Sequence, residues 1–201
     1  MNNLYEVVAS LLDYPGADWH VRVERCEEAL TIHEPEVAAQ FMGFHRKAQE
    51  LSISQLQELY TQTFDLNPVC TLDIGYHLFG ENYKRGELLA NLRRTEAPYS
   101  VGQENQLPDY LPVLLRLLVN LEDEDLRRSL IGELLIPALD TMLKAFGTAE
   151  NPYRYMVEVT RRVLGNEQPE APAASWNNET VEVPELYRIS SYASPRSDGR
   201  R

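Results

Sequence analysis

The chain has 201 residues, of which 43% are hydrophobic, and it carries a formal net charge of −12 at pH 7. This length is sufficient for one sizeable hydrophobic core but short for two, so we expect a single domain. The negative charge argues against a nucleic-acid-binding protein, because contacts to phosphates need clustered lysine and arginine. It favours solubility and attraction to basic partners.

The cysteines and the apolar segments indicate in which cellular compartment the protein is expected. Cys26 and Cys70 lie far apart, with no CxxC or Cys/His metal-ligand spacing, which fits two free thiols in a reducing cytosol. No run of about 18 apolar residues occurs, and no basic region precedes the first apolar stretch, which Glu6 and Asp13 flank. We therefore expect no signal peptide, no membrane-spanning helix and a cytoplasmic location.

The first two predicted helices come directly after the N-terminus. Apolar residues at positions 4, 7, 8, 11 and 12 form one helical stripe, which the sequence Tyr14-Pro15-Gly16 ends. Asp18 is a candidate N-cap for the second helix. The residues predicted to be buried on that helix are Trp19, Val23, Cys26 and Leu30.

Two more helices are predicted before residue 65. The third spans about residues 35–51, with a proline at its start. Its predicted buried residues are Val37, Phe41, Phe44 and Ala48. The fourth begins near Ser52, which forms a candidate capping box with Gln55, and it continues to Phe64.

The second half of the chain begins with a predicted surface loop over residues 93–106, where Thr95, Pro98 and Gly102 interrupt the helical period. The helix from residue 111 is apolar on nearly every side, so we expect it at the centre of the fold.

Three further predicted features complete the core. The acidic run at residues 122–125 is interpreted as a cap for a helix over 126–135. Pro137 kinks or restarts the chain into a helix that ends at Phe146-Gly147, and a last helix begins at Pro152.

The pattern as a whole predicts an all-α, single-domain helical bundle over residues 1–165, because neither strand-like alternation nor a solenoid repeat occurs. Residues 166–201 are rich in proline, serine, asparagine and glutamate, and we expect them to form a disordered tail. A chain truncated after about residue 165 should therefore keep its helical core.

Two stretches carry more information than ordinary connections. Residues 60–92 join the fourth helix, through a loop opened by Asp65, Asn67 and Pro68, to short helical segments around 72–79 and 84–92. The second stretch, QLPDYLPVLL at 106–115, places Asp109 between two prolines at the start of the most apolar helix. We call residues 60–92 and 106–115 the two signature stretches.

Catalytic and cofactor motifs are absent from the sequence. The histidines at 20, 33 and 45 have no metal-pair spacing, and neither a GxSxG nor a phosphate-binding glycine motif occurs. His77 has Asp73 four residues before it, so a weak nucleotide-binding hydrolase using Asp73, His77 and Lys84 is an alternative. We expect a protein that is not an enzyme and carries no stoichiometric metal, nucleotide or pterin.

The words TFDLN, YHLFG, KRGE and LPDYLP resemble those of NarJ-type assembly chaperones of molybdenum-containing nitrate reductases, in the wider TorD family of redox-enzyme maturation proteins. The resemblance covers residues 1–165 in layout. It implies an all-helical cytoplasmic chaperone that binds the N-terminal segment of a catalytic subunit while the molybdopterin cofactor is inserted. The family's acidic residue and histidine appear here as Asp109 and Tyr110, so this chain lacks the titratable imidazole.

The resemblance and the residue pattern together predict a peptide-binding groove with apolar walls and a polar rim. Its predicted residues are Phe64, Asp65, His77, Arg85, Asp109 and Tyr110. The client is expected to be a nitrate reductase catalytic subunit or that of a related molybdoenzyme, and the chaperone a monomer or a domain-swapped dimer. A helical adaptor for a signalling partner is a third interpretation.

Overall fold

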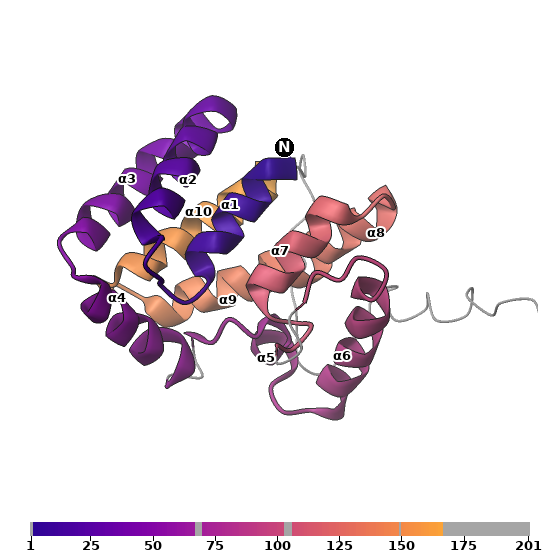
Figure 1. Cartoon of the computed structure of the whole chain (residues 1–201). Coiled ribbons are helices and arrows are strands. Elements are labelled where there is room, and N and C mark those ends of the chain that lie inside the picture. Colours follow the sequence, from indigo (N-terminus) through magenta and orange to yellow (C-terminus); the bar gives the residue numbers. More distant parts are fainter. Residues whose placement is uncertain (1, 67–69, 103–105, 149, 167–201) are drawn as a thin grey trace, which may run out of the picture.

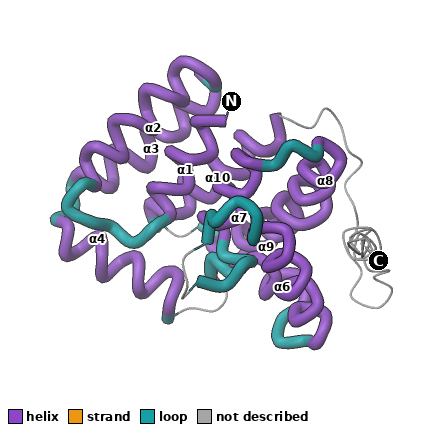
Figure 2. The backbone as a smooth tube through the Cα atoms, turned by 45° about the vertical axis from the view of Figure 1, so that its right-hand side comes forward, coloured by secondary structure: helices purple, strands orange, loops and turns teal. Residues whose placement is uncertain are grey.

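The structure is a computed structural model, and it describes residues 2–66, 70–102, 106–148 and 150–166. The predicted tail from residue 167 onward lies outside these residues, as do Asn67 and Pro68 of the first signature stretch. The described chain is helical and contains no strand, which confirms the all-α prediction (Figure 2). The helices in chain order are α1 (Asn2–Leu12), α2 (Trp19–His33), α3 (Pro35–Gln49), α4 (Ile53–Tyr60), α5 (Ile74–Phe79), α6 (Tyr83–Glu96), α7 (Leu111–Asn120), α8 (Glu124–Ser129), α9 (Ile136–Phe146) and α10 (Pro152–Asn166).

Helices α1 and α10 occupy the middle of the molecule (Figure 1). Helix α1 packs against α2 and α7, and α10 packs against α3 and α9. Helices α5 and α6 lie below α7 in this view, and α5 packs on α9. The predicted central helix is confirmed, because the residues of α7 that are buried are Leu111, Pro112, Val113, Leu114, Leu115, Leu117 and Leu118.

The local signals for the first four helices are largely confirmed. The predicted buried residues of α2 and α3 are the buried ones, and Ser52 and Gln55 form the capping box of α4. The capping role predicted for Asp18 is wrong: its side chain accepts no capping hydrogen bond and pairs with Arg22 instead, at 2.8 and 2.9 Å. The backbone of Asp18 is not in the extended conformation that aims a cap at the helix amides, and a guanidinium offers stronger, charge-assisted bonds.

Two stretches that the sequence predicts as α-helix form the wider π-helix. Thr61–Asp65 (η1) follows α4, and Leu130–Leu135 (η3) joins α8 to α9, both as π-helix. Pro137, in the first turn of α9, has no amide hydrogen to donate and crowds the preceding turn, and the wide turn of η3 lies just before it. The chain therefore restarts after η3, as Pro137 predicts, without leaving the helical path.

The loop predicted over residues 93–106 is wrong at its start, because α6 continues to Glu96. Arg93 stabilises this last turn by pairing with the buried carboxylate of Glu96 at 2.5 Å and donating to the Gln106 carbonyl at 2.9 Å. The helix ends two residues before Pro98, which has no amide hydrogen to donate to the preceding turn.

Two smaller predictions are also confirmed. The Asp123 carboxylate accepts hydrogen bonds from the amides of Asp125 and Leu126 at 3.0 Å, so the acidic run does cap α8. Cys26 and Cys70 are free thiols, and both are buried. Across the residues that the structure describes, no helix has the length and apolar character needed to span a membrane.

Candidate functional site

The two signature stretches meet through their backbones. An isolated antiparallel β-bridge joins Asp73 to Tyr110, and it is flanked by main-chain hydrogen bonds of 2.8 and 2.9 Å. One of these runs from the Leu111 amide to the Leu72 carbonyl. The bridge fixes the start of α5 against the start of α7, so residues that are far apart in the sequence form one region.

A buried ion pair lies directly behind this bridge. The Arg85 Nε donates to Asp109 Oδ2 at 2.9 Å, and Arg85 Nη2 donates to Asp73 Oδ2 at 3.1 Å. The side chain of Asp109 has no exposed surface, whereas that of Asp73 is 30% exposed. One guanidinium from α6 therefore serves two carboxylates, one in the core and one at the surface.

Gly75 makes room for this ion pair. Its amide donates to Asp109 Oδ2 at 3.2 Å. A Cβ atom at position 75 would lie 2.7 Å from Asp109 Oδ2 and 2.8 Å from Leu88 Cδ2, closer than van der Waals contact allows. Sequence reasoning missed Gly75, because an isolated glycine in a short helix gives no signal about what approaches it in space.

The burial of Asp109 changes what this residue can do. Burial raises the pKa of its carboxyl above the ordinary value, while the hydrogen bonds from Arg85 and the Gly75 amide act in the opposite direction. Its two oxygens are occupied by protein donors, and none of its surface reaches solvent. In this structure Asp109 supports the site from behind, and direct contact with a peptide stays a prediction.

In front of the bridge lies a cavity of about 270 Å³. It is lined by Tyr60, Phe64, Asp65, Thr71, Leu72, Asp73 and Tyr110. Three of the six predicted site residues, Phe64, Asp65 and Tyr110, are among these. Three of the seven lining residues are aromatic, and two are carboxylates at the rim. We call this space the signature cavity.

Two tyrosine hydroxyls close one side of the signature cavity. The Tyr60 hydroxyl donates to the Leu12 carbonyl at 2.9 Å, which leaves its oxygen to accept from the Tyr110 hydroxyl at 2.7 Å. Burial raises the pKa of Tyr110 to about 12 and raises that of Tyr60 further. Both hydroxyls are therefore protonated at neutral pH and act as hydrogen-bonding groups.

The aromatic wall continues into the core. The ring of Phe64 lies edge-on to those of Tyr60 and Tyr153, with centroids 5.0 and 4.9 Å apart. Such edge-to-face contacts stabilise an aromatic cluster beyond simple burial. The Tyr153 hydroxyl, from α10, is buried and has no hydrogen-bond partner among the described residues.

The π-helical turn η1 directs residues into the cavity. It carries Phe64 and Asp65. It is held by Thr63, whose hydroxyl donates to the Leu59 carbonyl at 2.6 Å and accepts from the Asn151 amide at 2.7 Å. Single π-helical turns occur frequently at functional sites. The sequence carries no recognised signal for such a turn.

Comparisons with known proteins bear on this region. No protein-family model matches the chain. It is 27% identical over 125 residues to the probable nitrate reductase molybdenum cofactor assembly chaperone NarJ of Bacillus subtilis, covering 61% of this chain and 68% of that protein. It is 25% identical over 195 residues to NarJ of Escherichia coli K12, covering 87% and 82%, and the same values hold for strain O157:H7. The chain is similar to these NarJ chaperones.

The homology confirms the resemblance that the signature stretches predict, at modest sequence identity. The relatives are described as NarJ assembly chaperones, which supports a chaperone role for this chain.

His77 lies close to the signature cavity, beside its lining residue Thr71. Its Nε2–H donates to the Thr71 carbonyl at 2.7 Å. Burial lowers the pKa of His77, although the Thr71 carbonyl and the nearby Asp73 act in the opposite direction. His77 is bonded to a backbone carbonyl and Asp73 to Arg85, and no hydrogen bond joins His77 to Asp73 among the described residues, so the hydrolase alternative gains no Asp–His pair. Among the described residues, no group of three or more potential ligands could hold a metal ion.

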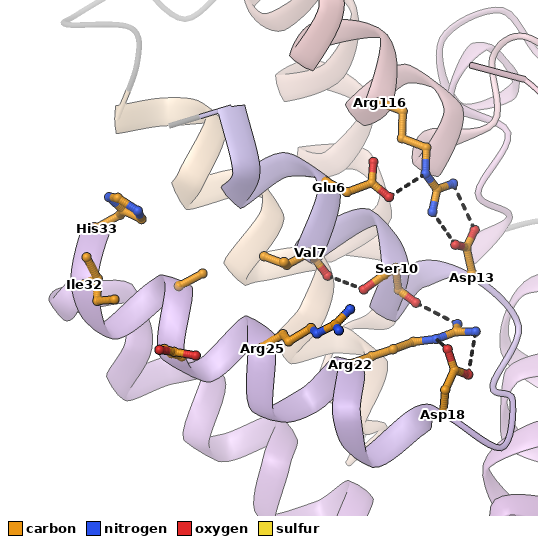
Figure 3. Close-up of a pocket in the computed structure, with 12 residues that line it drawn as sticks. Glu6, Val7, Ser10, Asp13, Asp18, Arg22, Arg25, Ile32, His33 and Arg116 are labelled. Carbon is orange, nitrogen blue, oxygen red and sulfur yellow. Dashed lines mark hydrogen bonds and ion pairs between the residues drawn. The ribbon is translucent and has the colours of Figure 1, made fainter. Parts of the chain in front are cut away.

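A second, larger cavity of about 610 Å³ lies between α1 and α2, close to α7 (Figure 3). Sequence reasoning missed it. Two arginines on its wall are already paired: Arg22 with Asp18, and Arg116 with Asp13 and Glu6. These pairs connect α1 to α7 and hold the loop before α2, which gives the paired groups a structural role. The signature cavity differs, because neither carboxylate on its rim belongs to an exclusive pair.

Proposed function

We propose that the chain is an assembly chaperone of a molybdenum-containing nitrate reductase. In this proposal it binds the N-terminal segment of the catalytic subunit in the cytoplasm and keeps that subunit open for insertion of the molybdenum cofactor. The names of its NarJ homologues support the class of client. The negative net charge supports attraction to a basic or amphipathic segment.

The observation that carries the proposal is the signature cavity at the junction of the two signature stretches. An amphipathic segment recognised by a groove needs apolar walls for its buried side chains and polar groups to orient it. Phe64 and the two tyrosines provide the walls, and Asp65 provides an exposed rim. Leu66, next to the rim, is 73% exposed, which leaves an apolar side chain available for a partner.

The other three predicted residues, Arg85, Asp109 and His77, do not line the cavity but hold the residues that do. Arg85 and Asp109 hold the β-bridge that forms the back of the cavity. His77 holds the Thr71 carbonyl, and Thr71 is part of the lining. All six predicted residues thus belong to one region, with Phe64, Asp65 and Tyr110 facing the client.

Calorimetric titration with synthetic N-terminal peptides tests the proposal. Peptides from the catalytic subunits of nitrate, selenate and dimethyl sulfoxide reductases, with a scrambled nitrate reductase peptide as control, would be titrated into the full chain. We expect saturable one-to-one binding of the nitrate reductase peptide and none of the scrambled peptide. Preference for another reductase would reassign the client, and equal binding of the scrambled peptide would contradict a specific chaperone.

The same titration addresses the domain organisation. We propose that residues 2–166 carry the whole binding activity, so a chain that ends after Asn166 should bind the peptide with the affinity of the full chain. A large loss of affinity in the shortened chain would instead assign part of the binding surface to residues 167–201.

A further inference from the structure

We propose that the signature cavity is a receptor for one basic side chain, arginine or lysine, of the bound segment. The identity of that segment rests on the proposed function, but the chemistry of the cavity does not. The inference therefore names what the site recognises: a cation on an alkyl stem, with its charge at the rim and its stem against aromatic rings.

The charges around the cavity are unbalanced. Three carboxylates, those of Asp65, Asp73 and Asp109, surround it or lie directly behind it, and Arg85 is the cation that pairs with two of them. Among the described residues that line the cavity there is no lysine, arginine or histidine. The group therefore has an excess of two negative charges, which one additional cation would reduce.

Asp65 and Asp73 are the carboxylates that a ligand can reach. Asp65 is exposed, and no hydrogen bond or ion pair reaches its carboxylate from the described part of the chain. Asp73 uses Oδ2 to accept from Arg85, which leaves Oδ1 without a partner among the described residues. Charge-assisted bonds to such oxygens are stronger than neutral hydrogen bonds.

Arg85 cannot take this role itself. Its Nε and Nη2 both reach the buried Asp109, and its side chain is only 16% exposed. Withdrawing Arg85 from Asp109 would leave a buried carboxylate without its counter-ion, which is strongly unfavourable. No cation of the described residues pairs with Asp65, so its carboxylate is available to a cation of the ligand.

The aromatic walls suit the same ligand. Tyr60, Phe64 and Tyr110 are among the lining residues, and an ammonium or guanidinium group over an aromatic face gains cation–π attraction, more so when water is excluded. A long basic side chain also buries its methylene stem against apolar surface while its charge stays at the rim. A cavity of about 270 Å³ has room for one such side chain. A bare metal ion fits less well, because the described residues offer no set of three ligands.

The first test uses a probe that does not depend on the client. N-acetylarginine methylamide would be titrated into the isotope-labelled full chain, with the citrulline analogue as a neutral control of the same shape. We expect amide chemical-shift changes confined to the residues around the signature cavity, produced by the arginine probe only. Changes produced equally by citrulline, or located in the cavity between α1 and α2, would overturn the inference.

The second test is a double-mutant cycle with the client peptide. Each basic residue of the peptide is replaced in turn by glutamine, and each peptide is titrated into wild type and Asp65→Asn. For one basic residue we expect a loss of at least about tenfold in affinity in wild type, the lower end for a hydrogen bond to a charged group, and little further loss in Asp65→Asn. Asp18→Asn, which removes a charge from the other cavity, should change neither value.

The outcomes separate the two proposals. A peptide that binds wild type tightly but shows no coupling of any basic residue to Asp65 or to Asp73→Asn would overturn the receptor and leave the chaperone function standing. A client peptide that does not bind at all would contradict the chaperone function, while the arginine probe would still decide the receptor. Thermal melts of each variant check that the charge replacements leave the fold intact.

Discussion

The Tyr60 hydroxyl lies 2.7 Å from the Tyr110 hydroxyl, so the end of α4 is joined to the residue that precedes α7. Tyr60 also donates to the Leu12 carbonyl at the end of α1. Three segments that are distant in the sequence therefore converge on one pair of hydroxyls. The signature cavity opens beside that pair, and its shape depends on both tyrosines.

Removing the Tyr60 hydroxyl should destabilise the fold. Tyr60→Phe keeps the ring but deprives the Leu12 carbonyl of its closest side-chain donor, and an unsatisfied buried group costs about 1–3 kcal/mol. Urea unfolding would measure the loss. Tyr83→Phe is the matched control, because Tyr83 is 72% exposed, and its stability should stay close to that of wild type. An equal change in the free energy of unfolding for the two substitutions would show that the hydroxyl pair does not stabilise the fold.

Gly75→Ala should destabilise the site by overpacking. The new methyl group would lie 2.7 Å from Asp109 Oδ2, and forcing extra volume into a packed region costs about 1–3 kcal/mol. Gly86→Ala is the control from α6, where an added Cβ meets no atom within 4 Å. That substitution should stabilise the helix by about 0.5–1 kcal/mol, because alanine loses less backbone entropy than glycine. Melting curves that shift in the same direction for both variants would contradict this account.

Asp109→Ala should lower the stability of the fold, and any loss of affinity for the client should follow from that. It removes the buried partner of Arg85, and breaking a buried ion pair costs about 3–5 kcal/mol, with the lower end expected because Arg85 keeps Asp73. Thermal melts and peptide titration on the same variant separate the two effects. Reduced affinity with an unchanged melting temperature would mean that Asp109 contacts the client directly, as the sequence alone suggested.

His77 should make the fold less stable in mild acid. Its folded-state pKa is lowered, chiefly by burial, below the ordinary value of about 6.5. The unfolded chain then binds more protons than the folded chain between these two pKa values, so the stability present above about pH 6.5 falls as the pH drops toward the folded-state pKa. Urea unfolding at about pH 7.5 and pH 5.5, on either side of that ordinary value, should show a smaller loss for His77→Asn than for wild type. An identical loss in both proteins would exclude His77 as the source.

Much of the fold was predictable because its signals are local. The apolar stripe of α1 and the capping box at Ser52 involve residues within a few positions of one another, so the helical period expresses them directly. The central position of α7 follows from its composition alone. Asp18 shows the limit of such signals. It stands at the N-cap position of α2, but its carboxylate forms an ion pair with Arg22 and does not cap the helix.

The candidate site was predictable only as a set of residues. Phe64, Asp65 and Tyr110 do line one cavity, but whether Asp109 faces solvent or the core depends on Arg85, which is 24 positions away. No periodicity encodes that contact. The pairing of Arg116 with Asp13, across 103 positions, is of the same kind, and it explains why the cavity between α1 and α2 was missed.

The central claim is that the client segment binds at the signature cavity, and site-specific photo-crosslinking tests it most directly. A photoreactive phenylalanine would replace Leu66, which follows the rim residue Asp65 in the sequence, or, as control, Ile32, which lines the cavity between α1 and α2. These two side chains are 73% and 66% exposed. The account predicts a crosslink to the nitrate reductase N-terminal peptide from position 66 and none from position 32. A crosslink from position 32 alone would contradict it and move the binding site to the other cavity.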